Sequence, residues 1–338
     1  MCVNISNLLY ENGHDVTLCA TRAGGPLEKS VTSGIKLHIL GKKSSADFVT
    51  FRRFISIIKD NGIEIIHAHS SSLFWAIAAK FFIRKVKVIW HDHLGLRVKD
   101  RKNSPIYRLL SGKIDGIIAV NEQLVDWSRK NMKVPAERIL MINNFPLLKD
   151  VDRHPDPEFF TIVCLANLRP QKDHETLVRA VALLKEQDLP KKLKVILAGS
   201  HDDVDYFRKI KDLIQELGYE KTIEMPGSVE DTSSLLASVD CGVLSSVSEG
   251  LPVSLLEYGM AGLPVVVTDV GHCTDVVGNG LYGKVVGSGD AIRLSEELLW
   301  IFTNPAEAHV MGEKLKEHIE NKYGPGNFMT NYLNLLAL

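Results

Sequence analysis

Short apolar runs alternate with longer amphipathic stretches along the whole chain. Runs of four to seven residues are typical of buried strands, and the stretches between them carry apolar residues at helical spacing. This alternation predicts an α/β protein with two Rossmann-like, doubly wound parallel sheets. The runs lie at residues 15–20, 63–68, 86–91 and 116–120, and a second set begins at 161–166.

A polar, proline-rich segment at 143–157 separates the two sets of runs. Such composition is typical of an interdomain linker. We therefore expect a first domain at 1–150, a second at 151–310, and a C-terminal helix at 311–338 that crosses back to the first. The reaction is expected in the cleft between the two domains.

Two carboxylates flank the start of a predicted helix in the second half. Glu249 precedes the helix, Pro252 suits its first turn, and Glu257 lies within it. A helix start attracts anions, so Glu249 is better placed for sugar hydroxyls than for phosphate, and Glu257 could accept from a ribose. The alternative is an acid stabilised by the helix dipole, followed by a solvated glutamate.

Two cations follow the strand predicted at 161–166. Arg169 and Lys172 lie in a turn before an amphipathic helix, at the carboxyl end of the strand, where open α/β sheets bind ligands. A guanidinium fork and a compact ammonium together suit a diphosphate. Solvated surface charge is the alternative.

Together these segments resemble the retaining glycosyltransferases of the GT4 family, which have the two-domain GT-B fold. The segment from Glu249 to Glu257, followed by 258–269, is similar to the family's E-x(7)-E helix and its A-x-G-x-P-V-V strand entry. The resemblance implies that Glu249 contacts the donor sugar and Glu257 the ribose. It also implies donor contacts at Gly250, Leu251, Pro252 and Val253. The family often has Phe-Gly where this chain has Leu251-Pro252, and Pro252 lacks a backbone donor.

The diphosphate-binding segment departs from the family pattern. The family usually carries Gly-Arg where this chain has Ala166-Asn167; Lys172 matches, and Arg169 is shifted by two. By resemblance to an N-L-R-P-x-K variant, Arg169 supplies the guanidinium. Gly199 is similar to a glycine-ended strand near the diphosphate and permits close backbone approach. Gly227 lies in a segment that resembles the one packing against the nucleobase, with an ordinary strand-end turn as the alternative.

Histidines alternate at two predicted strand ends, His67-x-His69 and His91-x-His93. By resemblance, His93 is the best match to the family's N-domain histidine near the donor sugar, with His91 the alternative. Alternating histidines could bind a metal, but no third ligand of suitable spacing follows, and the family is generally metal-independent. We therefore predict no metal.

Composition fits a large enzyme. The chain has 338 residues, 45% of them hydrophobic, which can fill two cores. It has neither an apolar run of membrane-spanning length nor a signal-peptide pattern, so we expect a cytoplasmic protein. Its five cysteines lack paired spacing, which indicates reduced packing residues.

Charge is unevenly divided. Residues 1–150 hold 23 Lys and Arg against 13 Asp and Glu, whereas 151–338 hold 17 against 28. Ten of the cations lie between Lys80 and Lys113. A basic first half suits a lipid-linked acceptor or peripheral binding to an anionic membrane face, with a solvated face as the alternative. We do not expect nucleic acid, because no binding motif accompanies the charge.

The resemblance implies transfer of a sugar from a UDP- or GDP-sugar to a glycan or lipid-linked acceptor with retained configuration, in cell-surface polysaccharide synthesis and without a tightly bound cofactor. The resemblance assigns catalytic roles to Glu249, His93, Arg169 and Lys172. Preorganised charge would stabilise the leaving diphosphate. A GT-B epimerase or sugar-phosphate synthase is an alternative. Residues 1–14 are predicted to form a helix and its end, where the family begins with a strand and a Gly-rich loop. A truncated, non-catalytic nucleotide-binding remnant is therefore a further alternative.

Overall fold

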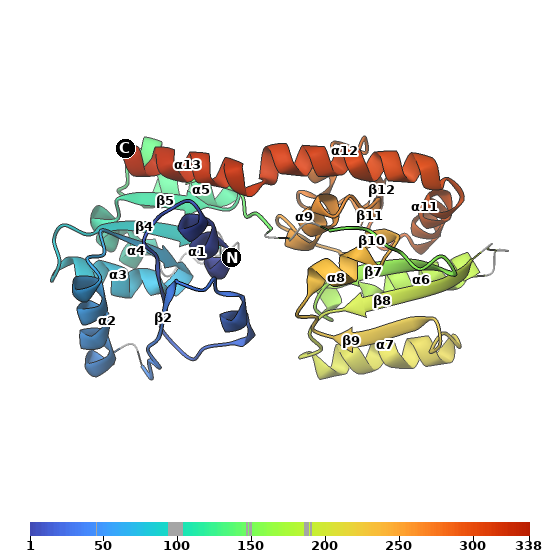
Figure 1. Ribbon diagram of the computed structural model, residues 1–338, viewed down its shortest axis with the longest axis horizontal. Helices are drawn as coiled ribbons and strands as arrows, with labels where there is room; N and C mark the ends of the chain where they lie inside the picture. Colours follow the sequence, from blue (N-terminus) through green and yellow to red (C-terminus); the bar gives the residue numbers. More distant parts are fainter. Residues whose placement is uncertain (45, 94–103, 147, 149–150, 186–188, 190) are drawn as a thin grey trace. The chain divides into compact units, whose positions relative to one another are not determined.

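The computed structural model describes residues 1–338 except 45, 94–103, 147, 149–150, 186–188 and 190 (Figure 1). The chain divides into two compact units: unit 1 comprises Met1–Phe145 with Pro325–Leu338, and unit 2 comprises Pro146–Gly324. The boundaries expected after residues 150 and 310 thus fall after 145 and 324. Within the described ranges, no helix combines the length and apolarity needed to span a bilayer.

Unit 1 contains two parallel sheets, one of four strands in the order β3-β4-β5-β6 and one formed by β1 and β2. The strands are β1 (Thr17–Ala20), β2 (Lys36–Ile39), β3 (Ile65–His69), β4 (Lys87–Asp92), β5 (Gly116–Ala119) and β6 (Ile139–Met141). The α-helices are α1 (Cys2–Glu11), α2 (Phe48–Asp60), α3 (Leu73–Lys80), α4 (Ser104–Leu110), α5 (Glu122–Asn131) and α13 (Pro325–Ala337). The 3-10 helices are η1 (Pro26–Ser30), η2 (Ser70–Ser72), η4 (Ser111–Lys113) and η5 (Ala136–Arg138).

The length and continuity of the apolar runs explain which strands of unit 1 the sequence reveals. β4 is buried from Val88 onward, as expected of a strand with neighbours on both sides. By contrast, the sequence pattern does not predict β2 or β6, since Lys36 and His38 interrupt the apolar run of β2 and β6 has three residues. The helix predicted at the start of the chain is present as α1, and Gly13 follows its end with φ +84°.

Unit 2 is built on one six-stranded parallel sheet in the order β12-β11-β10-β7-β8-β9 (Figure 1). The strands are β7 (Phe159–Leu165), β8 (Lys192–Ala198), β9 (Ile223–Gly227), β10 (Cys241–Leu244), β11 (Val265–Thr268) and β12 (Lys284–Val286). The α-helices are α6 (His174–Lys185), α7 (Val204–Glu216), α8 (Thr232–Ala237), α9 (Val253–Met260), α10 (Cys273–Val276), α11 (Ala291–Thr303) and α12 (Pro305–Tyr323), and a 3-10 helix, η6 (Pro170–Lys172), precedes α6.

Strand order in unit 2 reverses between β7 and β10, because β8 and β9 follow on one side of β7 whereas β10 to β12 follow on the other. Loops leaving such a pair of strands diverge to opposite faces of the sheet, which opens a crevice at their carboxyl ends. The sequence pattern does not predict β10, which is only four residues long. The reversal itself is visible only in the folded sheet.

Tyr258 separates β7 from β10 near this reversal. The two strands pair at Ile162 with Cys241 and at Val163 with Gly242. Beyond that point the buried Tyr258 hydroxyl accepts a hydrogen bond from the Leu165 backbone N–H at 2.6 Å. A Cβ at Gly242 would lie 2.6 Å from the Tyr258 ring, so glycine is required for the ring to fit.

Candidate functional site

The two loops at the strand reversal bring together the predicted Lys172 and Glu249. Lys172 ends η6, which follows β7, and Glu249 lies in the loop between β10 and α9. The Lys172 Nζ lies 2.6 Å from the Glu249 Oε1. The carboxylate side chain is only 6% exposed and that of the lysine 23%, so solvent screens this ion pair less than it would a surface pair.

Three further hydrogen bonds fix the two loops against each other. The Val247 N–H donates to the Gln171 carbonyl at 2.9 Å, and the Gln171 side-chain amide donates to the Ser248 carbonyl at 2.8 Å. The Ser245 hydroxyl donates to the Lys172 carbonyl at 3.1 Å. Because these hydrogen bonds join the backbones of the two loops, the positions of Lys172 and Glu249 are set by the loops as well as by their side chains.

Glu249 has a second partner that the sequence pattern does not identify. The buried Ser246 hydroxyl donates to the Glu249 Oε1 at 2.6 Å. Ser246 is in turn fixed by Thr268, whose hydroxyl donates to the Ser246 carbonyl at 2.7 Å. A sequence signal exists in the S-x-x-E spacing, which elsewhere marks a capping box but here lies in a loop.

The loop after β11 completes the surroundings of Glu249. Gly271 has φ +56°, and a Cβ there would lie 2.1 Å from the Glu249 carbonyl oxygen. The His272 N–H donates to the Gly250 carbonyl at 3.1 Å. Three consecutive strands of the sheet, β7, β10 and β11, therefore contribute loops to one site.

The structure corrects the expected place of Pro252 and the alternative interpretation of Glu257. Pro252 is the N-cap residue of α9, with φ −75° and ψ 115°, and Val253 is the first helical residue. Glu257 is partly buried in α9 instead of solvated, and loss of hydration raises its pKa from 4.5 to about 7. This carboxyl group therefore changes charge near neutral pH.

The remaining predicted residues of unit 2 differ in exposure and packing. Arg169 is exposed and forms the N-cap of η6. Gly199 faces its own sheet, since a Cβ there would lie 2.1 Å from the Ala166 carbonyl oxygen. Its N–H donates to the carbonyl of Gly227, which has φ +82°. Leu251 is partly buried, whereas a Cβ at Gly250 would have no atom of the described residues within 4 Å.

His93 lies in unit 1, at the end of β4, where its Nε2 is 2.8 Å from the Nδ1 of His69. The Leu94-Gly95 part of its motif lies outside the described residues. The role of His93 near a donor sugar therefore stays a prediction. Its ring stacks on those of His69 and His91.

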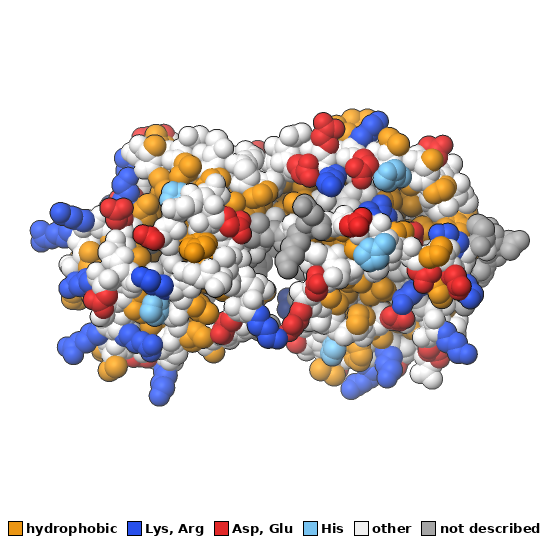
Figure 2. Space-filling view, viewed as in Figure 1, with side chains coloured by type: hydrophobic (Ala, Val, Ile, Leu, Met, Phe, Trp, Pro, Cys, Tyr) orange, Lys and Arg blue, Asp and Glu red, His pale blue; other side chains and the backbone are white. Residues whose placement is uncertain are grey.

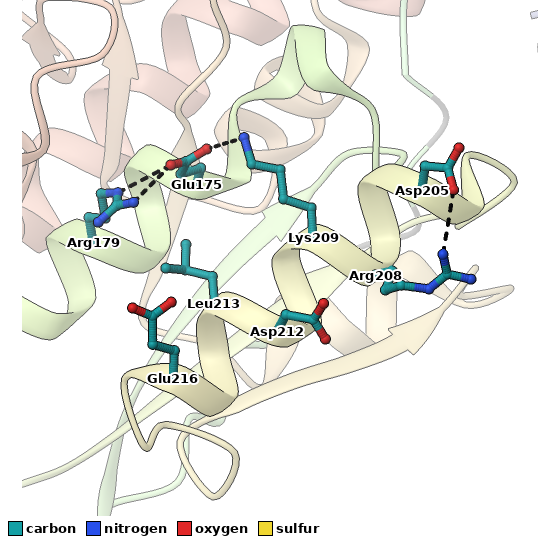
Figure 3. Close-up of a pocket in the computed structure, with 8 residues that line it drawn as sticks. All are labelled: Glu175, Arg179, Asp205, Arg208, Lys209, Asp212, Leu213 and Glu216. Carbon is teal, nitrogen blue, oxygen red and sulfur yellow. Dashed lines mark hydrogen bonds and ion pairs between the residues drawn. The ribbon is translucent and has the colours of Figure 1, made fainter.

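A surface pocket between α6 and α7 is chemically different from the site at the strand ends (Figure 3). Glu175 pairs there with Arg179 at 2.9 Å and with Lys209 at 2.6 Å, so the acidic and basic side chains that line the pocket largely compensate each other. None of its eight lining residues belongs to the predicted set. We therefore assign the candidate site to the strand ends. The lining residues are Glu175, Arg179, Asp205, Arg208, Lys209, Asp212, Leu213 and Glu216.

The Lys172–Glu249 site provides a cation beside a hydroxyl acceptor at a helix N-terminus. An ammonium group binds phosphate oxygens as a point charge, and a carboxylate accepts hydrogen bonds from sugar hydroxyls. A partly buried second carboxyl, Glu257, lies within the helix. This combination suits a ligand that joins a diphosphate to polyhydroxylated groups.

Comparison with known proteins matches both halves of the chain to glycosyltransferase families. The family described as Glycosyl transferases group 1 matches residues 149–318, and Glycosyltransferase Family 4 matches residues 1–145. The N-acetyl-alpha-D-glucosaminyl L-malate synthase of Bacillus anthracis is 21% identical over 305 residues, covering 85% of this chain and 77% of that protein. The poly(ribitol-phosphate) alpha-N-acetylglucosaminyltransferase of Staphylococcus aureus is 23% identical over 227 residues, covering 67% of this chain and 44% of that protein.

Solved structures share the fold. The structure of Anabaena HepE in complex with UDP and glucose has a TM-score of 0.80 at 16% identity, covering 99% of this chain and 95% of that one. A glycosyltransferase from Rickettsia africae has a TM-score of 0.78 at 17% identity, covering 99% and 92%. These likenesses confirm the GT-B class that the resemblance to the GT4 family implied. The chain belongs to the GT4 family of group 1 glycosyltransferases and is a transferase enzyme.

Proposed function

We propose that this chain transfers a sugar from a nucleoside diphosphate sugar to a glycan or lipid-linked acceptor with retention of configuration. The observation that carries the proposal is the Lys172–Glu249 pair at the strand reversal of unit 2. Ligands of open α/β sheets bind at such a reversal. The donor is expected to enter with its diphosphate toward Lys172 and its sugar toward Glu249.

Donor binding would exchange partners within this pair. The diphosphate takes the Lys172 ammonium, and the released Glu249 carboxylate accepts from hydroxyls of the sugar. Ser246 keeps Glu249 oriented during the exchange through its 2.6 Å hydrogen bond. Arg169, exposed at the start of the same turn, can add a second cation, and Glu257 can accept from the ribose.

In the transfer step, the bond between the anomeric carbon and the diphosphate oxygen breaks, and the acceptor oxygen bonds to the same face of the sugar. The acceptor proton passes to the departing diphosphate. Negative charge therefore accumulates on the leaving group, beside Lys172. Preorganised positive charge at that position lowers the barrier because it costs no reorganisation during the reaction.

The relatives narrow the expected substrates. The HepE structures are described with UDP, with UDP and glucose, and with UDP-glucose. This supports a UDP-sugar as the first donor to test, with a GDP-sugar second. The Staphylococcus aureus relative is named for transfer of N-acetylglucosamine to poly(ribitol-phosphate), which supports a polymeric acceptor.

Calorimetric titration with UDP, GDP and ADP tests the nucleotide site, and incubation with the preferred UDP- or GDP-sugar and candidate acceptors tests transfer. Proton NMR of the first product, before any anomeric equilibration, reports whether configuration is retained. Product formed only with a glycan or lipid-linked acceptor supports the proposal. Transfer to a sugar phosphate or epimerisation of the donor favours the alternative enzymes, and binding without turnover favours a nucleotide-binding protein without catalysis.

A membrane-facing role for unit 1 has its own support in exposed apolar and basic residues side by side. Phe81 and Phe82, which follow α3, are 65% and 66% exposed, and Arg84 and Lys85 next to them are also accessible to solvent. The Lys113 Nζ lies 5.5 Å from the centre of the Phe81 ring. On the face seen in Figure 2, charged side chains of both signs are interspersed with hydrophobic ones. Aromatic and basic residues in one patch suit an anionic lipid surface.

Sedimentation with vesicles tests this role. We expect binding to phosphatidylserine-containing vesicles, little binding to phosphatidylcholine vesicles, and loss of binding in Arg84→Glu/Lys85→Glu. Equal sedimentation with both kinds of vesicle, or with neither, would contradict it.

A further inference from the structure

Unit 1 places four histidines on one face of two neighbouring strands. His67 and His69 alternate on β3, and His91 and His93 follow the same spacing at the end of β4. In the parallel pair of strands, His69 lies opposite His91. Since side chains two residues apart point to the same side of a sheet, all four imidazoles share that side.

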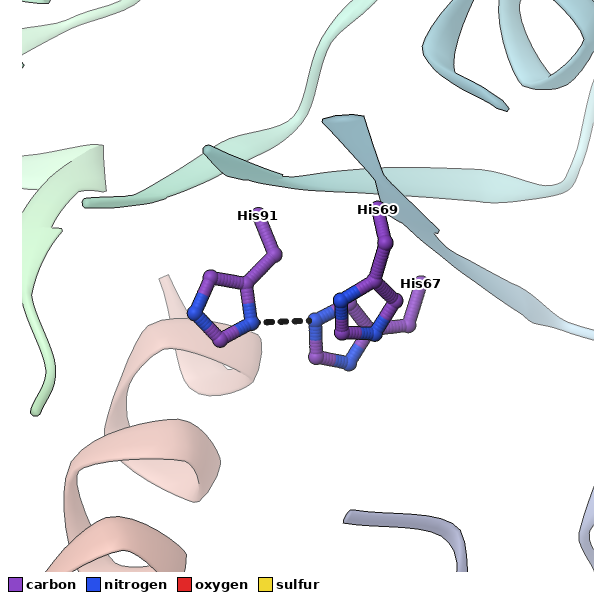
Figure 4. A group of neighbouring side chains, drawn as sticks. All are labelled: His67, His69 and His91. Atoms are coloured by element: carbon purple, nitrogen blue, oxygen red, sulfur yellow. Dashed lines mark hydrogen bonds between the residues drawn. The ribbon is translucent and has the colours of Figure 1, made fainter. Parts of the chain in front are cut away.

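The rings are close enough to act on one ion. A nitrogen from each of His67, His69 and His91 lies within 4.8 Å of the other two (Figure 4). The His67 Nε2 is 3.2 Å from the His91 Nδ1. Two imidazole nitrogens bound to a tetrahedral Zn²⁺ at about 2.0–2.1 Å are about 3.3 Å apart, so this pair already has the spacing of two ligands.

Burial leaves part of the polar surface of these imidazoles unsatisfied. His91 is fully buried, and the two ring nitrogens outside the 3.2 Å contact, the Nε2 of His91 and the Nδ1 of His67, have no hydrogen-bond partner among the described residues. The two nitrogens of the 3.2 Å contact are the ones placed to bind an ion together.

Helix α13 covers the cluster from the other side. The Tyr332 ring stacks on His67 with centroids 5.3 Å apart, and the Phe328 ring lies 6.5 Å from that of His91. These aromatic rings exclude water and restrict imidazole rotation. Contacts of this kind, together with hydrogen bonds to the ligands, orient the imidazoles in protein metal sites.

We propose that His67, His69 and His91 form a binding site for a divalent transition metal of the zinc class, and that His93 orients His69 through their 2.8 Å hydrogen bond. A three-histidine set leaves a fourth position for water or another ligand. Soft-to-borderline metals that favour imidazole, Zn²⁺, Co²⁺ and Ni²⁺, fit this donor set better than Mg²⁺ or Ca²⁺.

This inference revises the sequence-based expectation of no metal. His67-x-His69 supplies two ligands, and no third follows them at a suitable spacing along the chain. The third comes from the neighbouring strand, at a position fixed by the pairing of β3 with β4. Sequence separation between His69 and His91 therefore conceals their contact.

The test uses the full chain stripped with EDTA and dialysed. Competition against a chromophoric chelator measures Zn²⁺ affinity, and elemental analysis measures stoichiometry, for which we expect one ion per chain. Co²⁺ loading should give visible absorption of tetrahedral geometry without the strong near-ultraviolet band of a cobalt–thiolate bond. That spectrum excludes the five cysteines as ligands.

Variants separate ligands from neighbours. His69→Gln should weaken Zn²⁺ binding by at least about a hundredfold, since it removes a ligand, and His93→Gln by about tenfold, since it removes an orienting contact. His309→Gln, at an exposed histidine of unit 2, should bind as the unchanged chain does. Circular dichroism without metal checks that each variant is folded.

Either of two results overturns the proposal. One is a stripped chain that takes up no stoichiometric Zn²⁺. The other is a folded His69→Gln variant with unchanged affinity. Should His69→Gln fail to fold, X-ray absorption of the Zn²⁺-loaded unchanged chain decides the matter, because the proposal requires imidazole nitrogens and no sulfur around the metal.

Discussion

Lys172 and Glu249 form an ion pair of 2.6 Å although 77 positions separate them in the sequence. Each follows one of the two strands that flank the reversal of strand order in unit 2. The pair neutralises itself while no ligand is bound, so a cation and a carboxylate are stored together without an uncompensated buried charge. A diphosphate must then compete with Glu249 for Lys172.

This competition predicts opposite effects of two substitutions on nucleotide binding. Lys172→Ala should weaken binding of UDP by at least about tenfold, because a charge-assisted contact is worth about 1.5–3 kcal/mol. Glu249→Gln should leave UDP binding unchanged or strengthen it severalfold, since the amide no longer holds the ammonium. Calorimetric titration of both variants measures the difference.

Sugar transfer should respond differently from UDP binding. Glu249→Gln is expected to lower kcat with a UDP- or GDP-sugar by at least about tenfold, because the carboxylate that accepts from the sugar is lost. Turnover at the rate of the unchanged chain in both Lys172→Ala and Glu249→Gln would refute the assignment of the site.

Glu257 predicts a pH-dependent effect on stability. Its folded pKa of about 7 exceeds the ordinary 4.5, so the favourable contribution of the protonated form is complete below pH 4.5 and is lost as pH rises through 7. Glu257→Gln does not titrate. As pH rises from 4.5 to 7, the variant should therefore become increasingly stable relative to the unchanged chain. Above pH 7 its free energy of unfolding should be higher by about 1–3 kcal/mol.

Urea unfolding at pH values of about 4.5, 6 and 8 measures this gain. The exposed Glu220→Gln serves as the matched control in the same unit. A difference that does not change with pH would show that burial of the Glu257 carboxyl is not its cause.

Tyr258→Phe removes only the hydroxyl that accepts from the Leu165 N–H. Because the site is buried, that N–H is left without a partner, and we expect a loss of about 1–3 kcal/mol in the free energy of unfolding. Tyr10→Phe, at a side chain 37% exposed, should change it by much less. Thermal unfolding of the two variants makes the comparison, and equal melting temperatures would contradict the role given to Tyr258.

Gly199→Ala tests close packing at the strand ends. The added methyl group would lie 2.1 Å from the Ala166 carbonyl oxygen, a backbone atom that cannot rotate away. We expect a loss of about 1–3 kcal/mol from the displacement of β7 or β8. Gly250→Ala, with open space around the new methyl group, is the control for stability. Similar denaturation midpoints for the two would refute the packing argument.

Local patterns in the sequence predict many of the strands and helices and the chemical types of residue in the candidate site. Apolar runs such as 161–166 are buried because their side chains leave water, whatever their partners, and so β7 was predictable. Lys172, Glu249 and Glu257 could be named as candidates from the sequence, because each lies beside or within a locally recognisable strand end or helix start. Strands β2, β6 and β10 were not predicted, since Lys36 and His38 interrupt the apolar run of β2, Gly242 interrupts that of β10, and β6 has only three residues.

Contacts between residues distant in the sequence become visible only in the folded chain. The order of strands in the sheet brings Lys172 to Glu249, and the pairing of β3 with β4 brings His91 to His69. It also determined that Ser246 holds Glu249 and that Glu257 is partly buried. Several strands of similar composition could pair with one another, and packing of the whole core selects the pairs that form. The residue pattern of a single strand therefore does not predict its neighbour in the sheet.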